Sequence, residues 1–163
     1  MQILTFAGSG RAGGSNRKLL QALPAAFSEY HFTEYTGENL PLFYDGATVD
    51  SAVKSWQKEI AAADALLICT PEYLHNLPAL VKNALEWLTA GGELAGKKVF
   101  PLTLTPHAPR GEKAMQSLLW SLQALDAQIA PSLALFRADI VYDAAGNLTE
   151  CAGREMLGEW LSS

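Results

Sequence analysis

Residues 8–16, with the sequence GSGRAGGSN, separate an apolar run (ILTFA, residues 3–7) from a leucine-rich segment with helical spacing. A strand, a loop of small residues and a helix together form an anion site, because crowded backbone N–H groups and the helix N-terminus both attract negative charge. Arg11 can pair with a phosphate there. The alternative is an ordinary connection in which Ser15 or Asn16 caps the helix. The spacing matches neither the dinucleotide fingerprint nor a Walker loop.

The composition suits one domain with a sizeable core, spanning residues 1–163. The chain has 163 residues, of which 49% are apolar, and a formal net charge of −5. It contains no basic run and only two cysteines, so we expect neither a nucleic-acid partner nor a disulfide-dense secreted scaffold. No leader sequence and no apolar run of membrane-spanning length are evident, so we expect a cytoplasmic protein with no membrane contact.

Apolar and amphipathic segments alternate along the chain. We predict strands at residues 2–7, 30–35, 65–70, 97–105 and 129–136, and helices at residues 16–29, from 51, from 78 to 91, 112–125 and 149–161. The third strand, ALLICT, is apolar throughout, as in a parallel strand that is covered on both faces. Pro131 is expected to disrupt the fifth strand. The alternation predicts an α/β fold, with a doubly wound, five-stranded parallel sheet and helices on both faces.

Three loops leave the carboxyl ends of the first, third and fourth predicted strands, at residues 8–16, 70–77 and 105–111. In the flavodoxin-like strand order 2-1-3-4-5 these strands are neighbours, so the loops meet where such sheets bind ligands. The first loop offers phosphate donors, the second the ring of Tyr73, and the third the hydroxyl of Thr105. A phosphate cradle beside an aromatic, amide-rich wall suits a mononucleotide that carries a flat ring.

Two motifs make this expectation specific. GSGR at residues 8–11 is followed by Asn16, and PEY at residues 71–73 is followed by Pro78 and VKNALEW at residues 81–87. In this order and spacing they resemble the NADPH-dependent FMN reductase family, over essentially the whole chain. The resemblance implies the flavodoxin-like fold and an enzyme that carries FMN.

The resemblance also implies which residues contact the flavin. In that family the first loop holds the FMN phosphate, and the Pro-Glu-Tyr loop lies along the isoalloxazine ring, largely through backbone groups. The candidate cofactor-binding residues are Ser9, Arg11, Ser15, Asn16, Pro71, Glu72, Tyr73 and Thr105. No catalytic side chain and no metal ligand are expected, because the flavin supplies the chemistry. Glu72 is expected to hydrogen-bond within its own turn.

The implied reaction passes hydride from NADPH or NADH through FMN to a small acceptor, namely a quinone, an azo compound, a metal oxyanion or a flavin. The resemblance further implies a homodimer or homotetramer. Two alternatives stay open, which are a flavodoxin-like electron carrier and a cofactor-free binding module on the same fold. Arg11 and the modest net charge argue against the carrier.

The third loop, TPHAPRG at residues 105–111, departs from the Ser/Gly-rich turn of the family and keeps the cofactor-free alternative open. Its Arg110 is a candidate partner for the 2′-phosphate of NADPH, and His107 a candidate proton donor. The simpler interpretation of both is an exposed loop residue. A further departure is Leu74, which stands where the family has Asn.

Overall fold

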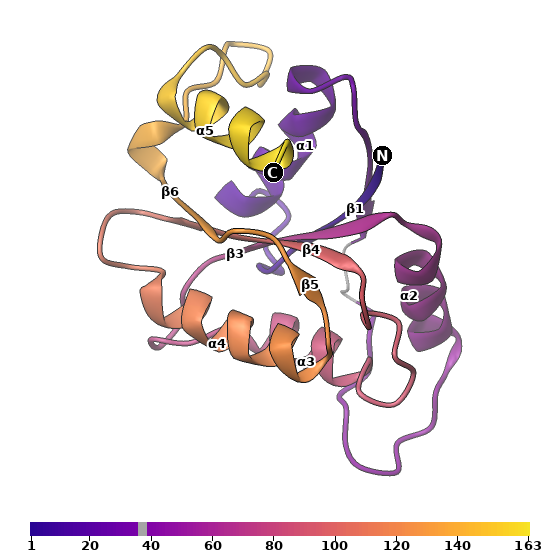
Figure 1. Cartoon of the computed structure of the whole chain (residues 1–163). Helices are drawn as coiled ribbons and strands as arrows, with labels where there is room; N and C mark the ends of the chain where they lie inside the picture. The colour runs from indigo at the N-terminus through magenta and orange to yellow at the C-terminus, as the bar shows by residue number, and fades with distance from the viewer. Residues whose placement is uncertain (36–38) are drawn as a thin grey trace.

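The computed structural model describes residues 1–35 and 39–163 as a three-layer α/β fold (Figure 1). The strands are β1 (Gln2–Ala7), β2 (His31–Tyr35), β3 (Ala65–Thr70), β4 (Lys98–Thr105), β5 (Gln128–Ile129) and β6 (Leu133–Phe136). The helices are α1 (Ser15–Ala26), α2 (Ser51–Ala62), α3 (Ala79–Glu86), α4 (Glu112–Ala124) and α5 (Ala152–Leu161), with a 3₁₀ turn, η1 (Arg137–Asp139). The strand order is β2-β1-β3-β4-β5, and β6 also pairs with β4. Every pairing between these strands is parallel, which confirms the predicted fold class and order.

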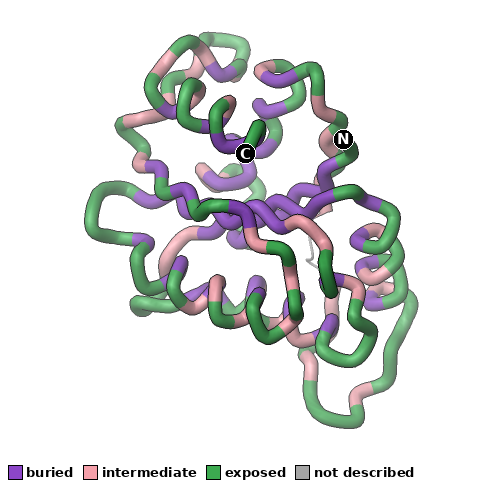
Figure 2. The backbone as a smooth tube through the Cα atoms, viewed as in Figure 1, coloured by how far each residue is buried: buried purple, intermediate pink, exposed green. Residues whose placement is uncertain are grey.

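The central sheet is buried on both faces by helices. In Figure 1, α1 and α5 lie on one side of the sheet and α2, α3 and α4 on the other. All six residues of β3 are buried, and the first five, from Ala65 to Cys69, alternate between two apolar clusters. Leu67 packs with α1 and α5, whereas Leu66 and Ile68 pack with the other three helices. Figure 2 shows this buried layer as a purple band across the molecule. The continuous apolar run of β3 is therefore explained by burial on both faces.

The fifth predicted strand is interrupted, as Pro131 suggested, and forms two short segments instead of one. The N–H of Ala130 still donates to the Val99 carbonyl, at 2.9 Å. Pro131 has no N–H to continue the ladder, and pairing with β4 resumes only at Leu133. The split moves the chain along the edge of β4, so that β5 pairs with its beginning and β6 with its end.

Several predicted helix bounds were wrong. The first helix ends at Ala26, two residues beyond Pro24, and the last begins at Ala152. Pro78 is the N-cap of α3 rather than its first residue, and α3 ends at Glu86, well before the glycines at 91–92. The end of α3 is held by a distant segment, because Trp87 Nε1 donates to the Pro41 carbonyl at 2.7 Å. The predicted loop at residues 37–46 falls partly outside the described residues.

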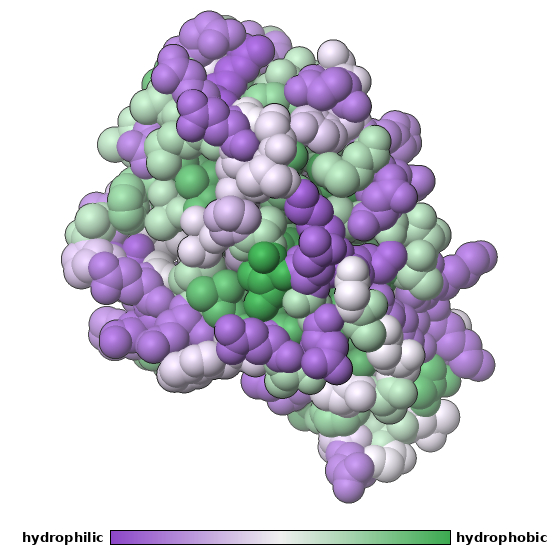
Figure 3. Space-filling view, in the orientation of Figure 1, coloured by the Kyte–Doolittle hydropathy of each residue, from purple (hydrophilic) through white to green (hydrophobic). Residues whose placement is uncertain are grey.

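The surface is mixed in character. In the space-filling view, hydrophilic and hydrophobic residues are interspersed, with a small hydrophobic area near the middle of the visible face (Figure 3). Within the part of the chain that the structure describes, no helix is long and apolar enough to cross a membrane.

Candidate cofactor site

The three predicted loops meet at the carboxyl edge of the sheet, around a cavity of about 310 Å³. That volume lies within the range of small-molecule sites, roughly 300–1,000 Å³. The structure brings all eight predicted site residues to its lining: Ser9, Arg11, Ser15, Asn16, Pro71, Glu72, Tyr73 and Thr105. His107 is not among the lining residues, whereas Arg110 is.

The close approach of β1 and β3 places the first loop. The N–H of Gly8 donates to the Cys69 carbonyl at 2.7 Å. A Cβ at Gly8 would lie 2.7 Å from both Thr70 Oγ1 and Val81 Cγ2, which is closer than real Cβ contacts come. Only glycine therefore lets the chain leave β1 at this point and turn into the cavity wall.

The start of α1 faces the cavity without a side-chain cap. Its N-cap is Gly14, so the alternative in which Ser15 or Asn16 caps the helix is wrong. By contrast, α2 is capped by Asp50, whose Oδ1 accepts from Val53 N–H at 3.0 Å. The residues from Gly13 to Asn16 line the cavity, so the positive end of the α1 dipole is available to a bound anion.

The side chain of Asn16 is buried and holds the loop to two strands. Its Nδ2 lies 3.2 Å from Cys69 Sγ and 3.4 Å from the Leu104 carbonyl. The side-chain amide is thus used within the protein, at the ends of two strands. The sequence had instead suggested that it donates to a ligand. Burial raises the pKa of the Cys69 thiol to about 12, even though the Asn16 contact lowers it. Cys69 is therefore a protonated, small buried side chain, as its strand pattern predicted.

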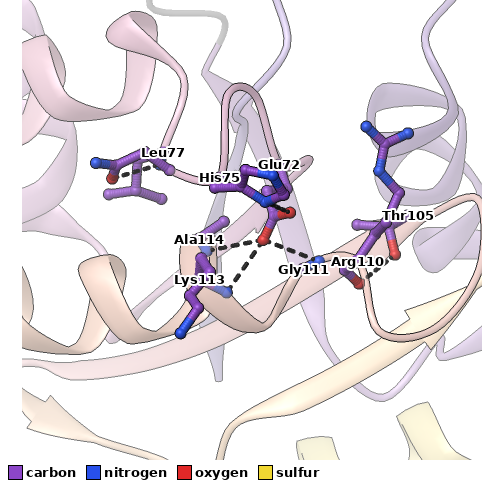
Figure 4. Close-up of polar contacts among 9 residues, drawn as sticks. Glu72, His75, Leu77, Thr105, Arg110, Gly111, Lys113 and Ala114 are labelled. Carbon is purple, nitrogen blue, oxygen red and sulfur yellow. Dashed lines mark hydrogen bonds and ion pairs between the residues drawn. The ribbon is translucent and has the colours of Figure 1, made fainter.

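Glu72 joins the second loop to the start of α4 (Figure 4). Its Oε2 accepts from the backbone N–H groups of Gly111, Lys113 and Ala114, at 3.1, 3.0 and 3.2 Å. Burial alone raises the pKa of this carboxyl, but the three backbone donors outweigh it, with a smaller contribution from His75, and the net pKa is lowered. The prediction that Glu72 bonds within its own turn holds only for Oε1, which lies 3.5 Å from His75 Nδ1, and it missed the three bonds of Oε2 at the start of α4. An ionised carboxylate at a helix N-terminus is a cap, not an acid or base.

Tyr73 opens a tight turn at the mouth of the cavity. Its N–H and carbonyl exchange hydrogen bonds with those of Asn76, at 3.0 and 2.9 Å. The two residues between them, Leu74 and His75, have φ values of 51° and 57°. Positive φ at both central positions is the requirement of a type I′ hairpin turn. The turn leaves the Tyr73 side chain 53% exposed beside the cavity.

The third loop closes on itself and forms a wall. Thr105 Oγ1 donates to the Arg110 carbonyl at 2.7 Å, and the N–H of Arg110 donates to the His107 carbonyl at 3.1 Å. The loop ends at Gly111, whose φ of 106° is the left-handed conformation that favours glycine. The hydroxyl of Thr105 is thus used by the protein itself. The loop lines the cavity without filling it.

Arg137 is a functional candidate that was not predicted from the sequence. It begins η1, immediately after β6, and lines the cavity together with Arg11 and Arg110. Three arginines therefore surround one cavity in a chain whose net charge is −5. The available signal was its position directly after the last strand of a parallel sheet, since strand ends gather at the ligand edge.

Comparison with known proteins places the chain among flavin-dependent reductases. The family model described as NADPH-dependent FMN reductase matches residues 1–139. The NADH:(hydroxy)cinnamate reductase subunit of Vibrio ruber is 30% identical over 158 residues, which cover 92% of this chain and 78% of that protein. The NAD(P)H-dependent FMN reductase of Pseudomonas aeruginosa is 28% identical over 100% of this chain and 92% of its own. Other relatives are named quinone reductase and NADPH azoreductase.

A solved structure agrees with the fold. The flavoenzyme NAD(P)H:(acceptor) oxidoreductase of Paracoccus denitrificans superposes with a TM-score of 0.82 at 24% identity, over 99% of this chain and 97% of that one. At that identity the likeness establishes the arrangement of strands and helices. It leaves the contacts in the cavity to be argued from this chain's own residues.

Proposed function

Since the chain belongs to the NADPH-dependent FMN reductase family and is an FMN-dependent NAD(P)H oxidoreductase, we propose that the cavity at the carboxyl edge of its sheet is the flavin site. Bound FMN would supply the redox chemistry, by taking hydride from a nicotinamide and passing electrons to an acceptor. The chain's own residues bind and orient the flavin. The observation that carries this assignment is the uncapped start of α1, which opens into a cavity lined by three arginines.

The phosphate end of the flavin belongs at α1. A dianion there gains from the helix dipole, from the backbone N–H groups of Ser15 and Asn16, and from the Arg11 guanidinium. The hydroxyls of Ser9 and Ser15 line the same region and can donate further hydrogen bonds. Asn16 serves here through its backbone, because its side-chain Nδ2 is directed at Cys69 and Leu104.

The ring end of the flavin belongs between the second and third loops. Pro71 and Tyr73 form one wall, and Pro106 and Arg110 form the other. Glu72 ties these two walls together through α4, so the separation between them is fixed before a ligand binds. A rigid slot is what a flat ring requires. The open cavity beside the third loop supports a flavin enzyme over a cofactor-free module.

We propose a quinone or another small conjugated organic molecule as acceptor. Relatives are named for quinones, an azo compound and a (hydroxy)cinnamate, which share a flat conjugated system. Tyr73 at the cavity mouth offers an exposed aromatic face for such a molecule.

A homo-oligomer and a cytoplasmic location complete the proposal. Exposed apolar side chains such as Leu42 and Trp120, which are 77% and 62% exposed, supply surface for a second copy. Sedimentation of the purified protein tests the first point. Fractionation of cells tests the second, since a nicotinamide donor is drawn from the intracellular pool.

An absorption spectrum tests the flavin assignment directly. The purified protein is expected to be yellow or to take up added FMN, and anaerobic NADPH is expected to bleach it. Uptake of FMN without bleaching would indicate an electron carrier. Neither uptake nor NADPH oxidation at saturating FMN would overturn the proposal.

A further inference from the structure

A second cavity of about 260 Å³ adjoins the proposed flavin site. The two cavities share four lining residues, namely Gly13, Ser15, Leu104 and Arg137. Gly13 and Ser15 belong to the first loop, where the phosphate of the flavin is proposed to lie. The second cavity therefore adjoins the phosphate end of the first, and Arg137 stands on the boundary between them.

The second cavity is cationic and partly apolar. Its remaining lining residues are Lys18 on α1, and Ile140 and Tyr142 just beyond η1. None of the described residues that line it is acidic. Lys18 Nζ lies 4.0 Å from the centre of the Tyr142 ring, a cation–π distance that holds the ammonium group over a flat surface. Burial raises the pKa of the Tyr142 hydroxyl to about 12, so this ring is neutral and adds no competing negative charge.

Such a lining suits an anionic group attached to a flat, weakly polar one. Both Lys18 and Arg137 can bind a phosphate. The ammonium group of Lys18 acts as a point charge, and the planar guanidinium of Arg137 can donate two parallel hydrogen bonds. The ring of Tyr142, with Leu104 and Ile140, provides surface for a base or a sugar. A phosphorylated nucleoside combines these two parts.

The position of the second cavity indicates which phosphorylated nucleoside it binds. An acceptor must reach the flavin ring, which is proposed to lie between the second and third loops, and none of the residues of those loops lines the second cavity. The hydride donor is longer, and its adenosine end does not react. NADPH and NADH differ only at that end, where NADPH carries a 2′-phosphate and NADH a neutral hydroxyl.

We infer that the second cavity receives the adenosine end of NADPH, and that Lys18 and Arg137 bind its 2′-phosphate and so make the enzyme prefer NADPH to NADH. This inference rests on the proposed function, because it assumes that the nicotinamide reaches a flavin in the first cavity. Arg110, the candidate suggested by the sequence, lies on the third loop and does not line the second cavity.

Kinetics with both donors tests the inference. Lys18→Ala and Arg137→Ala are each expected to lower kcat/KM for NADPH about tenfold more than kcat/KM for NADH, a ratio that corresponds to about 1.4 kcal/mol. Lys18→Arg is expected to restore most of the preference. Lys54→Ala, which removes an exposed charge from α2 on the opposite side of the sheet, is the matched control and is expected to leave the ratio unchanged.

Calorimetry gives a readout that needs no turnover. FMN-loaded protein is expected to bind adenosine 2′,5′-bisphosphate at least tenfold more tightly than adenosine 5′-monophosphate, and Lys18→Ala and Arg137→Ala are expected to remove that difference. The same titration is made with protein to which no FMN has been added. If the protein takes up no FMN or oxidises no nicotinamide but still discriminates between these two nucleotides, the proposed function fails and the second cavity still binds the 2′-phosphate.

Several results would each overturn the inference itself. One is equal affinity of the unaltered protein for the two nucleotides. Another is an equal loss with NADPH and NADH in the Lys18 and Arg137 variants, or a lost preference in Arg110→Ala alone. A further result is weaker FMN binding in Lys18→Ala with an unchanged NADPH preference, which would assign Lys18 to the flavin phosphate.

Discussion

Three polar side chains at the cavity hold neighbouring segments of the protein in place. Asn16 is directed at two strand ends, Glu72 caps α4, and Thr105 closes the third loop. In each case the side chain is used within the protein, which leaves the backbone N–H groups and the arginines for a ligand. The cavity is thus shaped before binding, and Arg11 is the side chain whose removal tests ligand contact rather than loop geometry.

Replacing Arg11 is expected to weaken flavin binding. Arg11→Ala removes an exposed guanidinium from the proposed phosphate site, and a lost hydrogen bond to a charged group costs about 1.5–3 kcal/mol, or at least tenfold in affinity. Titration of FMN fluorescence quenching measures the dissociation constant. Lys58→Ala, on the exposed side of α2, controls for the change in net charge. An unchanged dissociation constant in Arg11→Ala would contradict the assignment.

Replacing Glu72 is expected to destabilise the protein in a pH-dependent manner. Glu72→Gln retains the shape but loses the charged cap, so we expect a loss of about 1–2 kcal/mol in the free energy of unfolding at neutral pH. Because the folded pKa of Glu72 is lowered, its stabilisation is present above the unfolded pKa and disappears as the pH falls through the folded value.

Urea denaturation at neutral and at acid pH measures this effect. The stability difference between the unaltered protein and Glu72→Gln should shrink on acidification. Glu112→Gln, an exposed acid in the first turn of α4, is the matched control and is expected to cost only a few tenths of a kcal/mol. An equal loss in both variants would show that the three hydrogen bonds to Glu72 carry no special stabilisation.

At the scale of elements, the buried strands could be predicted and the element ends could not. Continuous burial leaves an unambiguous apolar run, so β3 begins and ends as expected. The early end of α3 coincides with bonds from Asn83 and Trp87 to the Pro41 carbonyl, which join segments more than forty residues apart. The predicted strand order identified which loops form the cavity. It did not show that Glu72 reaches α4, because that contact depends on where two separate elements lie.

The Tyr73–Asn76 turn carries a testable strain. Leu74 has a φ of 51° and is 99% exposed. The left-handed backbone conformation is unfavourable for leucine, and no packing of its side chain compensates for it. Leu74→Asn is expected to raise the free energy of unfolding by about 0.5–1 kcal/mol, because Asn tolerates this conformation. Val49→Asn, at another exposed apolar residue, is the control for removing a surface apolar group. Equal effects of the two substitutions in urea denaturation would argue against strain.

At the scale of the whole molecule, the flavin is expected to act as a stabilising ligand. It would bridge loops that leave β1, β3 and β4. A ligand whose free concentration is one hundred times its dissociation constant stabilises the folded state by about 2.7 kcal/mol. The melting temperature is then expected to rise by several degrees when FMN is added. Differential scanning fluorimetry with FMN, and with riboflavin as the control that lacks the phosphate, measures the shift. Equal shifts with both compounds would contradict a phosphate site at α1.

The two ends of the chain lie at the edge of the sheet opposite the cavity. Met1 precedes the first residue of β1, and the Ser163 carbonyl accepts a hydrogen bond from Nζ of Lys98, the first residue of β4. An eight-residue strand such as β4 separates that edge from the cavity by roughly 26 Å. A linker that attaches either end to a solid support therefore leaves the cavity facing the solution. Protein immobilised in this way should bind and release acceptors and nicotinamides as freely as protein in solution.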